Sequence, residues 1–325
     1  MIEAQTKNNF FNQKRYSVAI IFFVTLAVYA NTLNNQFTNW DDVALIINNE
    51  QIRSLNLKNI KAIFDFRAQG TYQPVRVLSY AIDYHFWKLN TVGYHIHSIL
   101  LHAFASIFLY LGMLEIIPGI RGMEHAEHAI VQYAAFFTAL VFAVHPLSTE
   151  AVTWLSGRKY VLLSLFAFFA LYLFAKGFKV KDGRSRLILG SVLLAVLAAL
   201  SSPFGVIFPL IVLICIFSMD GSNNPVYVLN KHKAVWLPYC VIFVPVFLKL
   251  WSALVKINPG GTGPGTGHVE GNSLYTLWTM LRVLFDYVRN IFFPFWLNIR
   301  YPDFVSQSFM DYKIITVITI IAVMA

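Results

Sequence analysis

The chain has 325 residues, of which 57% are hydrophobic and only 13% are charged, and its mean hydropathy is +0.59. Soluble domains carry roughly 25% charged and about 45–50% apolar residues, so this composition excludes an ordinary soluble domain and a disordered chain. In a soluble protein the net charge of +9 would favour a nucleic-acid partner. In a membrane protein the same excess usually marks cytoplasmic loops, so we expect no nucleic-acid partner.

Apolar stretches long enough to cross a bilayer recur along the chain. A transmembrane helix needs about 20 mostly apolar residues, and the sequence therefore predicts an all-α polytopic membrane protein of about eight or nine transmembrane helices in a single domain, 1–325. The last apolar run is too short to cross alone, which predicts a half-span or a truncated C-terminus. The predicted spans are 16–33, 94–117, 129–146, 158–176, 187–201, 203–219, 234–254 and 274–293, with the last run at 312–325.

Basic residues predict the orientation of these spans. Lys14 and Arg15 precede the first span, and the loop 176–186 contains many basic residues and a single acid, Asp182. Because Lys and Arg concentrate in cytoplasmic loops, the N-terminus is expected inside the cell. The long loop 34–93 and a glycine-rich loop, 257–272, are then external, the latter as a flexible connector.

The external loop 34–93 contains the pattern of a short amphipathic helix. Ser54 can cap a helix in which Leu57, Ile60 and Phe64 share one face. This pattern predicts a juxtamembrane helix that lies on the outer surface.

Two adjacent carboxylates, Asp41 and Asp42, follow the first span. Neighbouring negative charges repel each other, so one of the two acids should take up a proton more readily, as a general base must. The alternative is a solvated loop in which Asp41 caps a helix.

Several polar residues lie close to predicted membrane boundaries. Gln73 and Arg76 precede an aromatic stretch that fits an interfacial belt, comprising Tyr80, Tyr84, Phe86 and Trp87. His95 and His102 share a helix face but lie about 10 Å apart along the axis, too far for one metal ion without a third ligand. We expect them to form hydrogen bonds within the membrane.

A further polar group follows the third predicted span, which ends at His145. If a helix begins near Ser148, then Glu150, Trp154 and Arg158 lie on one face, as a structural ion pair or as a site for an anionic ligand. Arg158 and Lys159 together suit a phosphate. Near the C-terminus a second set shares a helix face, either paired or lining a polar cavity: Arg282, Asp286 and Arg289.

The order of these motifs resembles one known family. It resembles the transmembrane and tetratricopeptide-repeat-containing (TMTC) O-mannosyltransferases and their bacterial relatives, without the soluble repeat array. The resemblance rests on Asn31, Phe37, Asp41-Asp42, Asn48, Tyr72-Gln73-Pro74, Gly93-Tyr94-His95, His102, His145-Pro146-Leu147, Glu150-Ala151-Val152 and Arg158-Lys159, and on the late run Tyr287-Val288-Arg289, Phe293-Pro294, Leu297 and Tyr301-Pro302.

The resemblance implies a GT-C glycosyltransferase fold in a bacterial inner membrane, with its active site facing outside. Such an enzyme moves a mannose-like sugar from a polyprenyl-phosphate donor to an acceptor hydroxyl on a protein or glycan and inverts the anomeric carbon. Asp41 or Asp42 would act as the base, no metal is required, and positive charge would receive the lipid phosphate. The implied donor-phosphate and substrate residues are Arg158, Lys159, Glu150, His145, His95, His102, Gln73, Arg76 and Arg289.

The sequence also departs from the family pattern. Gln73 replaces Arg or His, Tyr160 replaces an Asp, and Ser202-Pro203 replaces Lys-Pro or Lys-Glu. These departures support an alternative, a diverged non-catalytic membrane protein that binds lipid or serves as an assembly scaffold.

Overall fold

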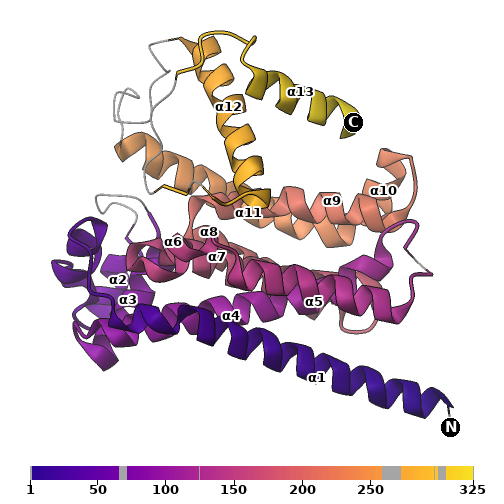
Figure 1. The fold of residues 1–325 in the computed structure, drawn as a ribbon, viewed down its shortest axis with the longest axis horizontal. Helices are drawn as coiled ribbons and strands as arrows, with labels where there is room; N and C mark the ends of the chain where they lie inside the picture. The colour runs from indigo at the N-terminus through magenta and orange to yellow at the C-terminus, as the bar shows by residue number, and fades with distance from the viewer. Residues whose placement is uncertain are drawn as a thin grey trace. The chain divides into compact units, whose positions relative to one another are not determined.

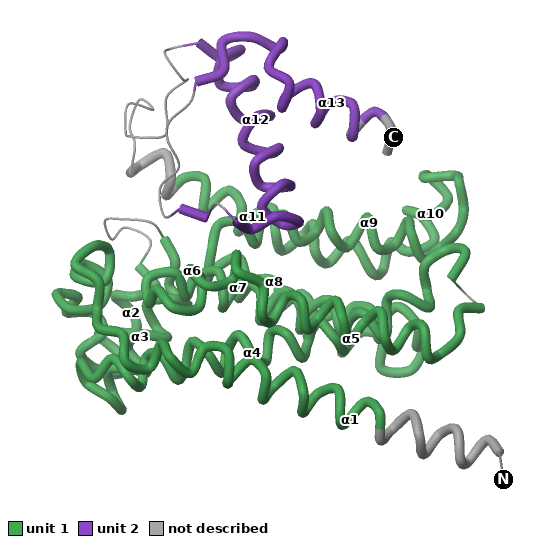
Figure 2. Tube along the Cα trace, in the orientation of Figure 1, with its two compact units in different colours: residues 1–253 green, residues 254–325 purple. Residues whose placement is uncertain are grey.

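The computed structural model describes residues 2–65, 72–123, 125–257, 272–295, 297–298 and 305–324, and all regular structure in these ranges is helical. The predicted all-α class is therefore confirmed. Cα positions divide the chain into two compact units, residues 1–253 and 254–325 (Figure 2). Most of the predicted glycine-rich loop, 258–271, lies outside the described residues.

Six helices among the described residues are long and apolar enough to cross a membrane, which makes the chain an integral membrane protein. A seventh apolar helix, α5 (His128–Val144), has 17 residues. Together the seven match the first seven predicted spans. The six long segments are Gln13–Asn34, Thr91–Gly119, Leu155–Lys179, Arg184–Ser201, Pro203–Asp220 and Lys233–Ser252.

The last two predicted spans form helices of a different character. Helix α12 (Ser273–Phe292) carries Arg282, Asp286 and Arg289, so it is not among the six apolar segments. The final run forms α13 (Tyr312–Met324), which has 13 residues and is shorter than a bilayer requires.

The first unit is a bundle of long helices that lie side by side (Figure 1). Helix α4 contacts α1, α5 and α7, and α7 also packs along α8. Small and branched side chains, including Ala170, Ala195 and Val192, fill the interior with Phe174. The long helices are α1 (Ile2–Tyr29), α4 (Thr91–Ile116), α5, α7 (Arg158–Lys179), α8 (Arg184–Ser201), α9 (Phe208–Asp220) and α11 (Lys233–Ile257).

Short helices gather at one end of this bundle, which we call the α3 end. They are α2 (Leu57–Ile63), α3 (Pro74–Trp87) and α6 (Ser148–Thr153), at the left in Figure 1. The start of α1, α10 (Pro225–Lys231) and the turns after α4, α7 and α9 form the opposite end.

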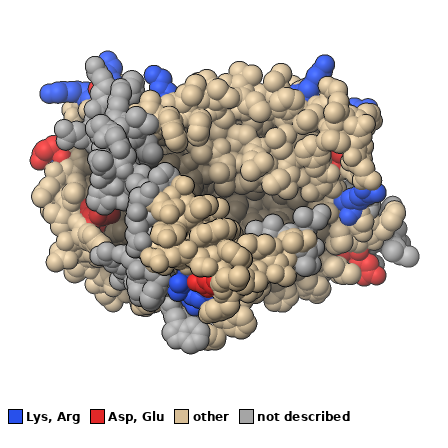
Figure 3. Space-filling model, turned by 90° about the horizontal axis from the view of Figure 1, so that it is seen from above, with Lys and Arg blue, Asp and Glu red and all other residues tan. Residues whose placement is uncertain are grey.

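We call this opposite end the basic end, because Lys14, Arg15, Arg121 and the basic residues of segments 176–186 and 231–233 lie there. The backbone N–H of Arg121 donates to the carbonyl of Ser218 at 3.0 Å, and Lys179 pairs with Glu115 at 3.1 Å. Figure 3 shows few Lys, Arg, Asp and Glu side chains on the face that it draws.

The juxtamembrane helix forms, but its cap differs from the prediction. Asn56, not Ser54, caps α2, because its side-chain oxygen accepts from the backbone N–H of Asn59 at 2.8 Å. The buried residue is Ile63, whereas Leu57 is 75% exposed. The prediction placed the cap two residues too early, because Ser54 and Asn56 are equally good caps in sequence.

One tight turn yields a test of the fold. After α8 the chain turns at Pro203–Ile207, where a Cβ on Gly205 would lie 2.5 Å from the backbone nitrogen of Ala199. We predict that Gly205→Ala lowers the free energy of unfolding by about 1–3 kcal/mol. The measurement is thermal unfolding of the purified protein in detergent.

The matched control is Gly112→Ala in α4, where the nearest atom to a new Cβ is 3.8 Å away, an ordinary contact. This variant should melt at or slightly above the wild-type temperature, since Ala favours a helix. Equal melting of both variants would show that the turn at Gly205 is looser than described.

Candidate functional site

A buried ion pair lies under the α3 end. Arg158, the first residue of α7, is completely buried, and its guanidinium donates to the carboxylate of Asp83 in α3. It also donates to Ser98 Oγ at 3.1 Å and to the carbonyl of Tyr94 at 2.7 Å. Asp83 is 1% exposed and contacts His97 Nδ1 as well. The pair therefore joins α3, α4 and α7.

Two tyrosine rings enclose this arginine. Arg158 Cζ lies 5.1 Å from the ring centroid of Tyr80 and 5.8 Å from that of Tyr94. The Tyr80 hydroxyl donates to the carbonyl of Leu155 at 2.7 Å, and burial raises the pKa of Tyr80 to about 12. Tyr80 therefore belongs to the core and not to the predicted interfacial belt, whereas Phe86, 69% exposed, fits that belt.

The predicted face of Glu150, Trp154 and Arg158 is wrong. Helix α6 ends at Thr153, and Trp154 adopts an extended backbone, φ −85° and ψ 117°, before α7 begins. At Gly157 a Cβ would lie 2.9 Å from the carbonyl oxygen of Glu150, so the chain folds back tightly here. Glu150 consequently lies exposed on its own helix, and the partner of Arg158 is Asp83.

Asp42 connects the first external loop to this turn. Its carboxylate accepts from the backbone N–H and hydroxyl of Thr38, both at 2.9 Å, and from the backbone N–H of Ser156 at 3.0 Å. The Ser156 hydroxyl donates to it too. Asp42 is 1% exposed, so its oxygens are occupied by donors and shielded from solvent.

Asp41 has the opposite environment. Its side chain is exposed, and no hydrogen bond joins it to any residue of the described ranges. Lys159 is half-buried and interacts electrostatically with Asp41, Glu150 and Arg76. The structure thus brings together four of the predicted site residues at the α3 end, two acidic and two basic.

Buried polar atoms without partners lie nearby. Among the described residues, Gln73 Oε1, Arg76 Nε and Ser202 Oγ have no hydrogen-bond partner. Gln73 and Arg76 begin α3, which packs against α8, and Ser202 directly follows α8. Because an unmet buried polar atom costs about 1–3 kcal/mol, these atoms favour a polar ligand between the two helices.

Two indole rings flank the acid pair. Trp40, which precedes Asp41, is 59% exposed, and its ring centroid lies 6.1 Å from that of Trp154. Trp154 Nε1 donates to Thr38 Oγ1 at 3.1 Å, which fixes the second ring. The two rings provide an aromatic surface beside Asp41.

The predicted histidines have different surroundings. His102 Nε2 lies 3.1 Å from the carbonyl of Ala143, which is the expected hydrogen bond within the membrane. His95 is 1% exposed, and neither ring nitrogen meets a hydrogen-bond partner among the described residues, so the hydrogen bond expected for it is not found there. His145 Nδ1 accepts from the backbone N–H of Leu147 at 3.2 Å and stabilises the turn before α6. No cluster of three or more metal-ligand side chains occurs in the described part of the chain.

Arg289 lies in the second unit, together with its ion-pair partner Asp286. It pairs with Asp286 at 3.2 Å, and Asp286 also pairs with Lys313 at 2.9 Å. Arg282 pairs with Asp311 at 3.2 Å. The expected pairing within this helix face is therefore found for Arg289 and Asp286, whereas Arg282 pairs with Asp311 outside the set.

The sequence interpretation missed one of the two buried acids of the site, Asp83, which is as buried as Asp42. The sequence does contain a pattern that could have indicated this acid. At helical spacing, Asp83 lies on the same face as three aromatic residues, Tyr80, Tyr84 and Trp87. An acid on such a face needs a buried cation, and Arg158 is the only one paired to it in the described structure.

Comparisons with known proteins agree with the motif order. A protein O-mannosyl-transferase from Caenorhabditis elegans, F38B6.6, is 27% identical over 199 residues, covering 58% of this chain and 26% of that protein. Mouse TMTC3, also a protein O-mannosyl-transferase, is 31% identical over 170 residues, covering 49% of this chain and 17% of that protein. The chain is TMTC-like.

Mouse TMTC4, a further protein O-mannosyl-transferase, is 28% identical over 173 residues, covering 49% of this chain and 23% of that protein. The chain thus spans about a quarter or less of the length of these curated relatives. No protein-family profile and no solved structure match the chain.

The ion pair of the TMTC-like chain yields a stability test. We predict that Arg158→Gln lowers the free energy of unfolding by about 3–5 kcal/mol, because it leaves Asp83 buried without its cation. The neighbouring Lys159→Gln should change it by less than about 1 kcal/mol, because Lys159 is only half-buried and has no ion-pair partner within hydrogen-bonding distance among the described residues. Thermal unfolding in detergent measures both, and equal losses would contradict the structural role of Arg158.

Proposed function

We propose that the chain is a membrane glycosyltransferase that moves mannose from a polyprenyl-phosphate donor to a hydroxyl group of a protein acceptor. The observation that carries the proposal is an exposed carboxylate, Asp41, which has no hydrogen bond to a described residue and interacts electrostatically with Lys159 at one end of a membrane bundle. Arg76 interacts with the same Lys159. The names of its relatives supply the class of reaction and the sugar.

Asp41 is the proposed general base. A base needs a free lone pair that faces the substrate, and the oxygens of Asp42 are already occupied by Thr38 and Ser156. Asp41 would accept the proton of the acceptor hydroxyl while the hydroxyl oxygen attacks the anomeric carbon of the sugar. The bond from that carbon to the phosphate oxygen breaks on the opposite face, so the configuration inverts and the lipid phosphate leaves with the bonding electrons.

Lys159 and Arg76 are the proposed phosphate contacts. Negative charge grows on the phosphate as the sugar departs, and fixed cations stabilise that charge more in the transition state than in the substrate. Arg158 has a different role in this proposal, because Asp83, Ser98 and the Tyr94 carbonyl already use its guanidinium. It positions the start of α7, and hence the next residue, Lys159.

The sugar would contact the exposed indole of Trp40. Aromatic rings combine an apolar face with low conformational entropy, and the flat apolar face of a hexose can stack on such a ring. Glu150, exposed on α6, is close enough to Lys159 to interact with its charge and would lie at the rim of the site.

The charge distribution supports an orientation for the site. Because positively charged loops remain in the cytoplasm, the basic end would face the cytoplasm and the α3 end the outer side. A lipid donor whose chain lies in the bilayer could then present its phosphate to Lys159 from the outer leaflet.

The two acids provide the sharpest test of the base. We predict that Asp41→Asn lowers mannosyl transfer at least about 100-fold with unchanged thermal unfolding, since the amide cannot accept the proton. Asp42→Asn should instead lower the free energy of unfolding by about 1–3 kcal/mol, because the amide turns a donor toward Thr38 or Ser156. Transfer is measured with purified protein and a radiolabelled polyprenyl-phosphate mannose.

Wild-type transfer by the Asp41→Asn protein would refute this base assignment. Absence of transfer by the wild-type protein, with several acceptor peptides and the donor, would instead favour the alternative of a non-catalytic lipid-binding or scaffold protein on the same fold.

The phosphate contact yields a separate prediction. Lys159→Gln should lower transfer about 10- to 100-fold, because one of the cations that stabilise the departing phosphate is removed. Lys159→Arg keeps the charge and should retain most of the activity. If the Lys159→Gln protein transfers mannose as well as the Lys159→Arg protein and the wild type, Lys159 does not contact the phosphate.

A further inference from the structure

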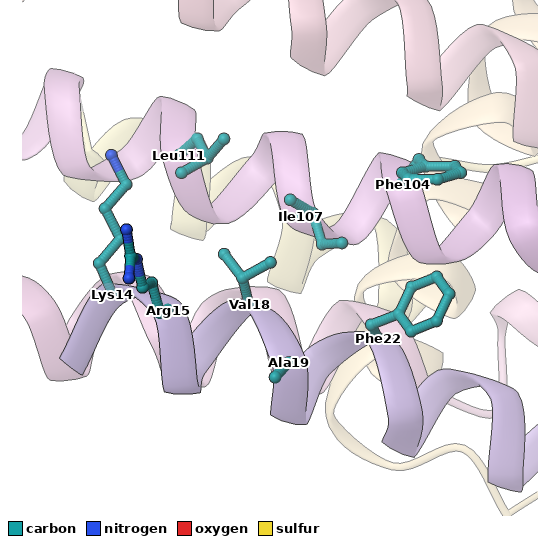
Figure 4. Close-up of a pocket in the computed structure, with 8 residues that line it drawn as sticks. All are labelled: Lys14, Arg15, Val18, Ala19, Phe22, Phe104, Ile107 and Leu111. Atoms are coloured by element: carbon teal, nitrogen blue, oxygen red, sulfur yellow. The ribbon is translucent and has the colours of Figure 1, made fainter. Parts of the chain in front are cut away.

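A groove runs between α1 and α4 at the basic end of the first unit, far along the bundle from Asp41. Its volume is about 570 Å³, and it is open to the outside of the bundle. Figure 4 shows its eight lining residues. They are Lys14, Arg15, Val18, Ala19 and Phe22 from α1 and Phe104, Ile107 and Leu111 from α4.

The groove has one polar end and one apolar end. Lys14 lies beside Leu111, and Phe22 lies beside Phe104, so the two helices run antiparallel along it (Figure 4). From Arg15 to Phe22 the distance along the helix axis is about 10 Å. The rings of Phe22 and Phe104, with centroids 6.1 Å apart, close the apolar end.

The chemistry of this lining matches one class of molecule. A phospholipid has a charged phosphate at the membrane surface and an acyl chain that extends toward the bilayer centre. Here two cations are followed by small and branched apolar side chains in the direction of the membrane interior. Ala19 has the shortest side chain of the eight lining residues. It therefore leaves space beside α1 for an acyl chain.

The positive charge selects among phospholipids. Lys14 is half-buried and Arg15 exposed, and neither forms an ion pair with another described residue. Long basic side chains lie along apolar surface and extend their charge to the membrane surface, where anionic headgroups attract them. A zwitterionic headgroup carries a cation of its own, which Lys14 and Arg15 repel. It should therefore bind here more weakly than an anionic headgroup.

We propose that this groove binds an anionic phospholipid of the leaflet at the basic end. Its phosphate contacts Lys14 and Arg15, and one acyl chain lies between α1 and α4 as far as Phe22 and Phe104. The site is separate from the proposed transferase site, since none of its residues lies at the α3 end. Bound lipid would hold α1 against α4 and so stabilise the bundle without entering the reaction.

The test measures lipid binding to the full chain by native mass spectrometry, with phosphatidylglycerol and phosphatidylcholine added separately in detergent. We expect the wild-type protein to bind phosphatidylglycerol more tightly and to melt at a higher temperature with it. The double variant Lys14→Gln/Arg15→Gln should lose this preference, with affinity for phosphatidylglycerol falling about tenfold or more.

Two further variants separate charge at this groove from charge in general. Lys181→Gln/Arg184→Gln removes the same charge from another turn of the basic end and should leave affinity unchanged. Ala19→Phe keeps both cations but fills the groove, and it should weaken binding of either lipid. Equal affinity of the wild type for both lipids, or equal losses in the two double variants, would overturn the proposal.

A second copy of the chain seated in the groove would also overturn it. In that case Ala19→Phe would convert a dimer to a monomer, as measured by light scattering, and added phosphatidylglycerol would have no effect.

Discussion

The ion pair between Asp83 and Arg158 is the interaction on which the candidate site depends. Both side chains are buried, and together with Ser98 and the Tyr94 carbonyl they hold α3, α4 and α7 in one arrangement. A buried pair is costly to form, but removal of either partner costs more, because the other charge remains in a low dielectric. Here the pair fixes the first turn of α7, and this turn sets the direction of Lys159.

Adjacent residues with the same charge have different roles at this site. Asp42 accepts hydrogen bonds from two segments and is enclosed, whereas Asp41 faces outward. In the same way Arg158 is enclosed and Lys159 is half-buried. Each structural residue positions its neighbour in the chain. In each pair of adjacent like charges, one residue is therefore held by buried contacts, and its neighbour is free to contact a ligand.

The sequence predicted the fold class and the helices because hydropathy reports membrane spans directly. It also placed Asp41, Glu150, Lys159 and Arg76 in one candidate site. It did not reveal that the helix breaks at Trp154, because Ser148 to Arg158 contains no proline and only one glycine, Gly157. The partner of Arg158, Asp83, is distant in sequence, so spacing along one helix could offer only Glu150 as a partner, as one of two alternatives. Long-range pairs of this kind follow from tertiary packing and not from local pattern.

In the proposed reaction a lipid phosphate binds beside Lys159 and Arg76, with the sugar next to Asp41. The most direct measurement is a cryo-electron microscopy structure of the full chain in lipid nanodiscs with a non-transferable polyprenyl-phosphonate analogue of the mannose donor. We expect phosphonate density in contact with Lys159 and Arg76, and the hexose between Asp41 and Trp40. Density for the analogue elsewhere, with Asp41 facing only water, would contradict it.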